Sequence, residues 1–181
     1  MSTLTKAAAQ RLIRKINGDT RVFVDDAVAG TWMCDRYAIF DPRIVLGPDG
    51  KNLDWMGSWD VTTKGIIKSE TPVPDMGSII ARAATCVQAT APVKYNGRLM
   101  TLHARVGGEA QAPVVLFADS NKRFEVALAA DRITLVCGED WVDALSHGVV
   151  VYVDDLHPET SPACIKRDGI VIGYLMPTRL S

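Results

Sequence analysis

The C-terminal stretch from residue 149 to residue 176 decides the fold. It reads VVVYVDDLHPETSPACIKRDGIVIGYLM and contains three short apolar runs, at 149–153, 163–166 and 170–176. Runs rich in β-branched residues predict strands, and Asp168 with Gly169 forms a dipeptide typical of tight hairpin turns. We therefore expect three strands, of which the last two form an antiparallel hairpin.

The first of these runs is echoed near the N-terminus. Residues 22–26 read VFVDD and residues 151–155 read VYVDD, and each copy is followed eight or nine residues later by a cysteine, Cys34 or Cys164. Each copy also follows a predicted helix and a short turn. The echo is compatible with chance, or with a duplicated unit of helix, strand, loop and strand that gives the fold internal pseudo-symmetry.

The rest of the chain predicts short strands with few helices, so we expect a strand-rich α+β fold. A proline-containing connector at 70–75 separates an expected N-terminal unit, residues 1–72, from a C-terminal unit, residues 73–181. The predicted helices are 4–17, 76–88, 97–106 and 139–147. The further predicted strands are 21–25, 31–40, 59–68, 114–118, 123–129 and 132–137.

Composition narrows the classes of function. The chain has 181 residues, 48% of them apolar, which is enough for a packed core. A net charge of -1 excludes a strongly basic nucleic-acid coat, although not a local basic face. The first residues lack a long apolar region, and no apolar run approaches the roughly 20 residues of a membrane helix. We therefore expect a cytoplasmic protein without membrane contact.

The cysteines and histidines do not indicate a metal site or a cofactor. Cys34, Cys86, Cys137 and Cys164 are widely spaced without a CxxC pair, which favours buried free thiols in a reducing compartment. The three histidines are not at metal-ligand spacing from one another. We expect neither a metal nor a cofactor.

No catalytic constellation is evident, so we expect no enzymatic activity. The segment from Tyr152 to Asp155 has the letters of a YxDD motif, in which paired carboxylates hold magnesium ions. The chain is too short for the surrounding polymerase apparatus, and Asp25 with Asp26 repeats the pattern. Solvated acids at a strand end are the simpler interpretation.

The predicted helix over residues 4–17 carries cations and no acid. These cations are Lys6, Arg11, Arg14 and Lys15. Such a helix can contact phosphates without reading bases, and it can equally be an ordinary solvated face.

The end of the chain resembles a known family. Residues 174–180, YLMPTRL, resemble the C-terminal end of bacterial-type DNA polymerase sliding clamps. Residues 132–145 are similar to the strand and short helix of the last half-domain of that family. Residues 34–39, CDRYAI, fall where the family often has Thr-Asp-Gly-His/Tyr-Arg-Leu, with Arg36 in place of glycine and Ala38 in place of arginine.

The resemblance implies clamp-like repeated units of a helix plus antiparallel strands. It implies a processivity factor that assembles as a homo-oligomeric ring around duplex DNA without sequence preference, with Lys6, Arg11, Arg14 and Lys15 facing the DNA. It also implies a pocket for short peptides of a polymerase or other clamp-binding partners. Carried over by position, its apolar lip is formed by Tyr174, Leu175, Met176, Pro177 and Thr178, and its strand side by Cys34, Tyr37 and Ile39. Leu175 and Met176 are expected to be exposed at this lip.

Two other functions fit the same sequence. One is a clamp-like interaction or decoy module that binds peptides without encircling DNA. The other is an unrelated strand-rich structural or assembly protein, for example of viral origin.

Overall fold

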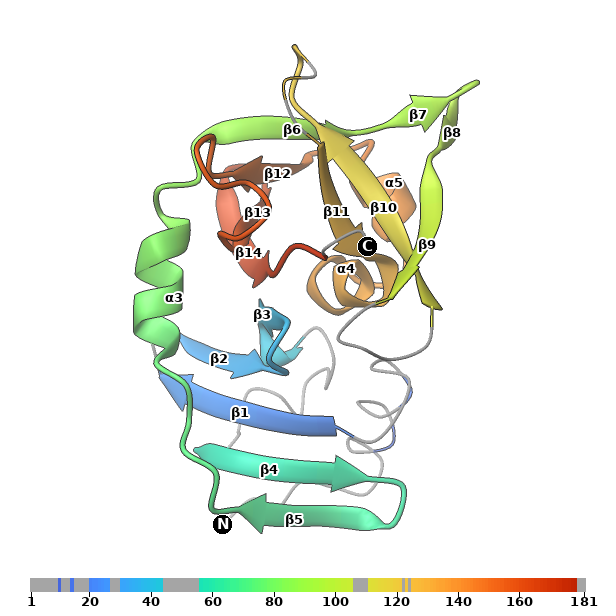
Figure 1. Cartoon of the computed structure of the whole chain (residues 1–181). Helices are drawn as coiled ribbons and strands as arrows, with labels where there is room; N and C mark the ends of the chain where they lie inside the picture. Colours follow the sequence, from blue (N-terminus) through green and yellow to red (C-terminus); the bar gives the residue numbers. More distant parts are fainter. Residues whose placement is uncertain are drawn as a thin grey trace.

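The computed structural model describes residues 10, 14, 20–26, 30–43, 56–105, 111–121, 123 and 125–178. Within them the fold is α+β, an antiparallel sheet with few helices, as predicted (Figure 1). Twelve strands of the described part form one sheet, in the order β11-β10-β6-β12-β13-β14-β3-β2-β1-β4-β5, with β9 beside β10.

The elements have the following bounds. The first group of strands is β1 (Thr20–Asp26), β2 (Thr31–Cys34), β3 (Ala38–Phe40), β4 (Gly57–Thr62) and β5 (Gly65–Ser69). The middle group is β6 (Gln88–Pro92), β7 (Lys94–Tyr95), β8 (Arg98–Leu99), β9 (Thr101–Arg105), β10 (Gln111–Ala118) and β11 (Glu125–Ala129). The last strands are β12 (Val149–Val153), β13 (Ala163–Arg167) and β14 (Ile170–Leu175). The helices are α3 (Met76–Ala83), α4 (Ala130–Cys137) and α5 (Trp141–Ala144).

The centre of the sheet is palindromic about the pair formed by β3 and β14. Going outward from this pair, β2 and β1 lie on one side and β13 and β12 on the other. The echoed residues take matching places, because Phe23 pairs with Cys34 just as Tyr152 pairs with Cys164. One row of paired residues crosses the six strands: Phe23, Cys34, Ile39, Tyr174, Cys164 and Tyr152.

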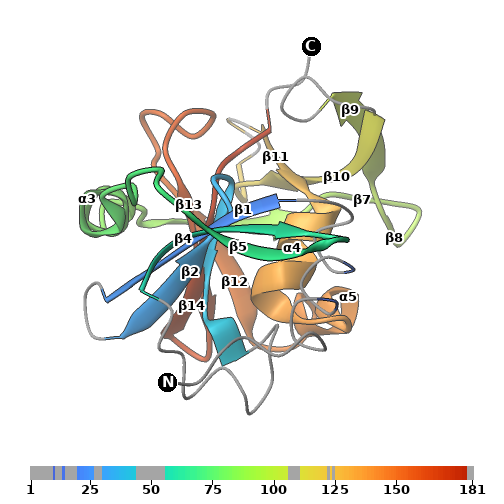
Figure 2. The same ribbon diagram turned by 90° about the horizontal axis from the view of Figure 1, so that it is seen from below.

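Helices cover both faces of this central sheet, as Figure 2 shows with α3 on one side and α4 with α5 on the other. The row of paired residues packs against α3 through Met76, Ile80 and Ala83. The alternate positions, such as Val22 and Val151, point to the opposite face and form the main core. This is the alternation that a two-residue side-chain period imposes on a sheet buried on both faces.

The main core lies where the sheet wraps around α4. This helix contacts β3 and β14 near the centre of the sheet and β10 and β11 near its end. Its residues Ile133, Leu135 and Val136 are fully buried. The prediction of a strand over 132–137 is therefore wrong: apolar contacts on all sides favour a helix here in spite of its β-branched residues.

Three other predicted elements differ in the structure. The helix predicted over 97–106 is absent from the described part of that range, which holds β8 and β9, because the left-handed residues Asn96 and Gly97 make a tight hairpin turn. The strand predicted over 31–40 is interrupted by a turn at Asp35–Tyr37. The strand predicted over 59–68 is the β4–β5 hairpin.

The other predicted helices and strands are confirmed, in whole or in part, where the structure describes them. The three C-terminal strands form as expected, and Asp168 with Gly169 makes the last turn, both with positive φ. Helix α3 occupies the first part of its predicted range, and α5 lies within the predicted 139–147. The basic helix lies outside the described residues, except for Gln10 and Arg14, which are helical and exposed.

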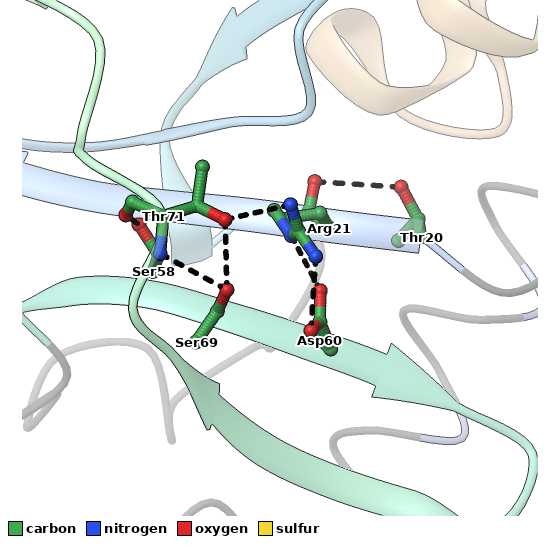
Figure 3. Close-up of polar contacts among 6 residues, drawn as sticks. All are labelled: Thr20, Arg21, Ser58, Asp60, Ser69 and Thr71. Carbon is green, nitrogen blue, oxygen red and sulfur yellow. Dashed lines mark hydrogen bonds and ion pairs between the residues drawn. The ribbon is translucent and has the colours of Figure 1, made fainter.

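A polar network joins β1 and β4 to the connector that leads into α3 (Figure 3). Arg21 and Asp60 face each other in the register of β1 and β4, and their side chains form a two-point ion pair with N···O distances of 2.5 and 3.1 Å. The same guanidinium donates to the Thr71 hydroxyl at 2.7 Å, and Ser58 donates to the Thr71 carbonyl. The hydrogen bond that Arg21 donates to the Asp60 carboxylate, together with the charge of Arg21, holds the pKa of Asp60 below its ordinary value. The network fixes where the connector leaves the sheet.

Gly173 of β14 offers a test of the packing between α4 and the central pair. A Cβ at this position would lie 2.6 Å from the Ile39 carbonyl oxygen and 2.7 Å from Val136 Cγ1. We predict that Gly173→Ala lowers the free energy of unfolding by about 1–3 kcal/mol, as expected for overpacking. Urea unfolding measures this. Gly30→Ala is the control, because its nearest neighbour lies 3.9 Å away, and equal stability of the two variants would contradict the close packing.

Candidate peptide-binding pocket

A small pocket opens where β3 and β14 meet the first turns of α3. Its volume is about 40 Å³, and its lining is almost entirely apolar. The lining residues are Cys34, Arg36, Tyr37, Ala38, Ile39, Ile79, Pro162, Tyr174, Leu175 and Met176. Segments far apart in the sequence therefore contribute to one site.

The β2–β3 turn forms the first wall, and its conformation is fixed by Asp35. The Asp35 carboxylate accepts hydrogen bonds from the backbone amides of Tyr37 at 3.1 Å and Ala38 at 2.8 Å. Such a bond from an Asp side chain to the backbone two residues on is typical of a tight turn. Arg36, which lies between Asp35 and Tyr37, adopts a left-handed backbone conformation with φ of 82°. The turn lifts Arg36 and Tyr37 to the rim of the pocket.

A buried ion pair ties this turn to α4. Asp35 Oδ2 lies 3.0 Å from Arg132 Nε, and the Asp35 side chain is fully buried. Burial raises the pKa of Asp35, while Arg132 and the two amides act in the opposite direction. The Arg132 guanidinium also lies over the Tyr37 ring, with Cζ 5.6 Å from the ring centroid. Arg132 therefore positions both the turn and the aromatic residue at the rim.

Strand β14 forms the second wall. Tyr174 is 7% exposed, and its ring packs against Trp32 with a centroid distance of 5.9 Å. Beyond the end of the strand, the Met176 amide donates to the Tyr37 carbonyl at 2.7 Å, which extends the pairing of β14 with β3 by one bond. Met176 is 37% exposed, so it is the flexible apolar side chain at the mouth of the pocket.

Helix α3 closes the third side. The helix begins after Asp75, whose carboxylate accepts from the Ser78 amide at 2.9 Å as an N-cap. Its residues Met76 and Ile80 are buried against the sheet, which places Ile79, partly exposed, at the pocket.

Six of the eight residues predicted for a peptide site line this pocket. They are Cys34, Tyr37, Ile39, Tyr174, Leu175 and Met176. Pro177 and Thr178 do not line it, and the Thr178 amide instead donates to the Ala127 carbonyl of β11 at 2.8 Å. Leu175, expected at an exposed lip, is 1% exposed and belongs to the main core, because β14 is a central strand rather than an edge strand.

Four lining residues are not predicted from the sequence. Arg36 and Ala38 lie within the quoted 34–39 segment, where they depart from the family pattern. Ile79 and Pro162 come from α3 and from the loop before β13, and no motif in the sequence marks them.

Of the residues predicted to contact DNA, the structure describes Arg14 alone, which is helical and exposed. Lys6, Arg11 and Lys15 lie outside the described residues.

The one titratable thiol that lines the pocket is that of Cys34. Burial raises the pKa of the Cys34 thiol to about 12, so the thiol stays protonated and is a poor nucleophile at neutral pH. Cys34, Cys86, Cys137 and Cys164 are all free and buried, as predicted. The described residues hold no group of three or more His, Cys, Asp or Glu side chains that could bind a metal ion. None of the described helices combines the length and apolar character needed to cross a membrane.

One carboxylate of the YxDD-like segment, that of Asp154, stabilises the loop that follows the strand. Asp154 accepts hydrogen bonds from the amides of Leu156 and His157 and from the Ser161 hydroxyl. These bonds, the Leu156 amide first among them, lower the pKa of Asp154. Asp154 therefore holds the loop that carries Pro162 into the pocket.

The left-handed conformation at Arg36 yields a second test. A non-glycine residue with positive φ is destabilised by roughly 1–2 kcal/mol relative to glycine, of which the flexibility of glycine in the unfolded chain cancels a part. We predict that Arg36→Gly raises the free energy of unfolding by about 0.5–1 kcal/mol. Chemical unfolding of this variant is compared with Arg82→Gly in α3, where glycine should destabilise the helix. A loss of stability in Arg36→Gly would contradict the turn geometry.

Neither a protein-family model, nor a curated protein, nor a solved structure matches the chain. The resemblance to sliding clamps therefore rests on the quoted residues.

Proposed function

We propose that the protein is a clamp-like processivity factor that assembles into a ring around duplex DNA and binds short peptides of its partners. The observation that carries this proposal is the pocket at β3, β14 and α3. Residues from the two segments that resemble clamp sequences, 34–39 and 174–176, lie in one apolar depression.

The pocket suits one apolar anchor side chain of a peptide. Its volume of about 40 Å³ exceeds that of a single water site but takes only the tip of a large side chain. Met176 at its mouth can shift to cover more of the anchor, since methionine adapts readily to irregular surfaces. Binding through one buried anchor and an open rim is a common mode of peptide recognition.

The palindromic sheet supports clamp-like repeated units. The two echoed strands, β1 and β12, are equally distant from the central pair, and each pairs with its neighbour through an equivalent cysteine. A chance echo has no reason to take matching registers, whereas a duplicated unit of helix and strands requires them.

Assembly of several copies is part of the proposal, since one short chain cannot surround DNA. Strand β5 ends the sheet with no further partner strand in the described part, and Ile67 on it is 68% exposed. An uncovered edge is a natural place for another chain to pair. A head-to-tail contact made there closes into a ring if the rotation per copy divides a full turn.

A peptide-binding module that does not encircle DNA is the second candidate. It is favoured by the direct pairing of β3 with β14, which brings the two walls of the pocket together within one fold, so peptide binding needs no ring.

Substitutions at the rim test peptide binding. We predict that Met176→Glu and Ile79→Glu each weaken binding by about tenfold or more, because burying one apolar side chain is worth roughly 1.5–3 kcal/mol. Fluorescence anisotropy of a labelled peptide from the clamp-binding segment of a bacterial polymerase measures this. The controls are Ile67→Glu and Ile170→Glu, which place the same charge at positions 68% and 71% exposed. Binding unchanged by the rim variants would contradict the assignment of the pocket.

Sedimentation equilibrium separates the two candidates. The ring predicts a discrete multiple of the chain mass, together with salt-sensitive retention on circular duplex DNA. Arg11→Glu with Arg14→Glu should weaken that retention at low salt, whereas Lys64→Glu with Arg82→Glu, an equal change of charge, should not. A monomer at high micromolar concentration would contradict the ring and leave the peptide-binding module.

A further inference from the structure

The hairpin formed by β7 and β8 projects from the main sheet, as Figure 1 shows. It is a separate two-stranded ribbon in which Lys94 pairs with Leu99 and Tyr95 pairs with Arg98. Asn96 and Gly97 make the turn with φ of 49° and 76°, the left-handed pair that a two-residue hairpin requires. The ribbon is therefore specified by its own turn residues.

The base of the ribbon is held firmly while its tip is free. Val93 donates to the Leu116 carbonyl at 2.8 Å, and Met100 donates to the Val93 carbonyl at 2.8 Å. Val93 also packs with Leu102 on the small core of β10 and β11. All five residues from Lys94 to Arg98 are exposed, and Tyr95 is 73% exposed. A fixed base presents the tip in one orientation.

The charged residues around the hairpin in the sequence are all positive. Residues 76–108 contain Arg82, Lys94, Arg98 and Arg105 and no acid, although the whole chain has a net charge of -1. Neither Lys94 nor Arg98 forms an ion pair or a side-chain hydrogen bond with the described part of the chain. Their charges are therefore available to an anionic partner.

We propose that the β7–β8 hairpin binds single-stranded nucleic acid, with a base stacked on Tyr95 and the adjoining phosphates paired with Arg98 and Lys94. Tyr95 and Arg98 are direct cross-strand partners, so they share one face of the ribbon and lie close enough to serve neighbouring parts of one nucleotide. Lys94 emerges from the other face, from which its long stem reaches the next phosphate. An exposed aromatic ring between cations is the combination that binds unpaired strands irrespective of sequence.

Unpaired bases fit the site better than a duplex. Stacking on Tyr95 needs an accessible base face, which a paired strand hides between its neighbours. An acidic peptide would use the cations but would gain nothing specific from the ring. This inference does not depend on ring assembly, because the hairpin lies within one chain. It does not depend on the peptide pocket either, because no residue of the hairpin lines that pocket.

The test is fluorescence anisotropy of labelled oligothymidylate with the full chain at low salt. We expect Tyr95→Ala to weaken binding roughly tenfold while Tyr95→Phe retains it, since a phenyl ring stacks as well. Lys94→Gln with Arg98→Gln should weaken binding further, and should reduce the slope of log affinity against log salt by about 0.7 for each phosphate that the protein no longer neutralises. Lys64→Gln, in the exposed turn of the β4–β5 hairpin, is the charge-matched control and should bind like the wild type.

Three results would overturn the proposal. The first is wild-type protein that does not bind oligothymidylate at low salt. The second is a Tyr95→Ala variant that binds as well as Tyr95→Phe, with circular dichroism showing both folded. The third is binding to phosphatidylserine vesicles or to polyglutamate that equals binding to oligothymidylate and falls with the same substitutions.

Discussion

The pairing of β3 with β14 is the constraint on which the rest of the structure depends. It joins a strand of the first forty residues to the last strand of the chain, and it is the centre of the palindromic sheet. On one face it supports α4, which approaches so closely that Gly173 has no room for a side chain. On the other face it carries the pocket. Without this pair, the two segments that resemble a sliding clamp would lie on unconnected strands.

The second determinant is the buried charge at Asp35. Its carboxylate shapes the β2–β3 turn through two backbone amides, and its ion pair with Arg132 fixes that turn to α4. A buried ion pair of this kind contributes little net stability, because both charges lose their hydration. Its value here is geometric: it sets the height of Tyr37 at the rim, and Arg132 also contacts the Tyr37 ring. The rim residues are thus positioned from the main core below them.

Much of this architecture could be predicted from local patterns. The three C-terminal strands and the Asp168–Gly169 turn follow from alternation and turn chemistry, and six pocket residues follow from the clamp-like segments. Helix α4 could not be predicted, since Ile133, Thr134 and Val136 favour a strand locally and only the enclosing sheet makes them helical. The place of Ile79 and Pro162 in the pocket could not be predicted either, because tertiary packing alone brings them there. The burial of Leu175 has no local signal either, because it depends on β14 being central in the sheet.

We propose from these features that the protein acts by binding. An apolar pocket with one protonated thiol, that of Cys34, suits a peptide anchor, and the separate basic hairpin of β7 and β8 suits an unpaired strand. Amide chemical-shift mapping with a clamp-binding peptide shows whether the pocket receives that peptide. Binding in the pocket is expected to produce the largest shifts at residues 36–39, 79 and 174–176. Shifts confined to the β4–β5 hairpin, or no shifts at saturating peptide, would contradict it.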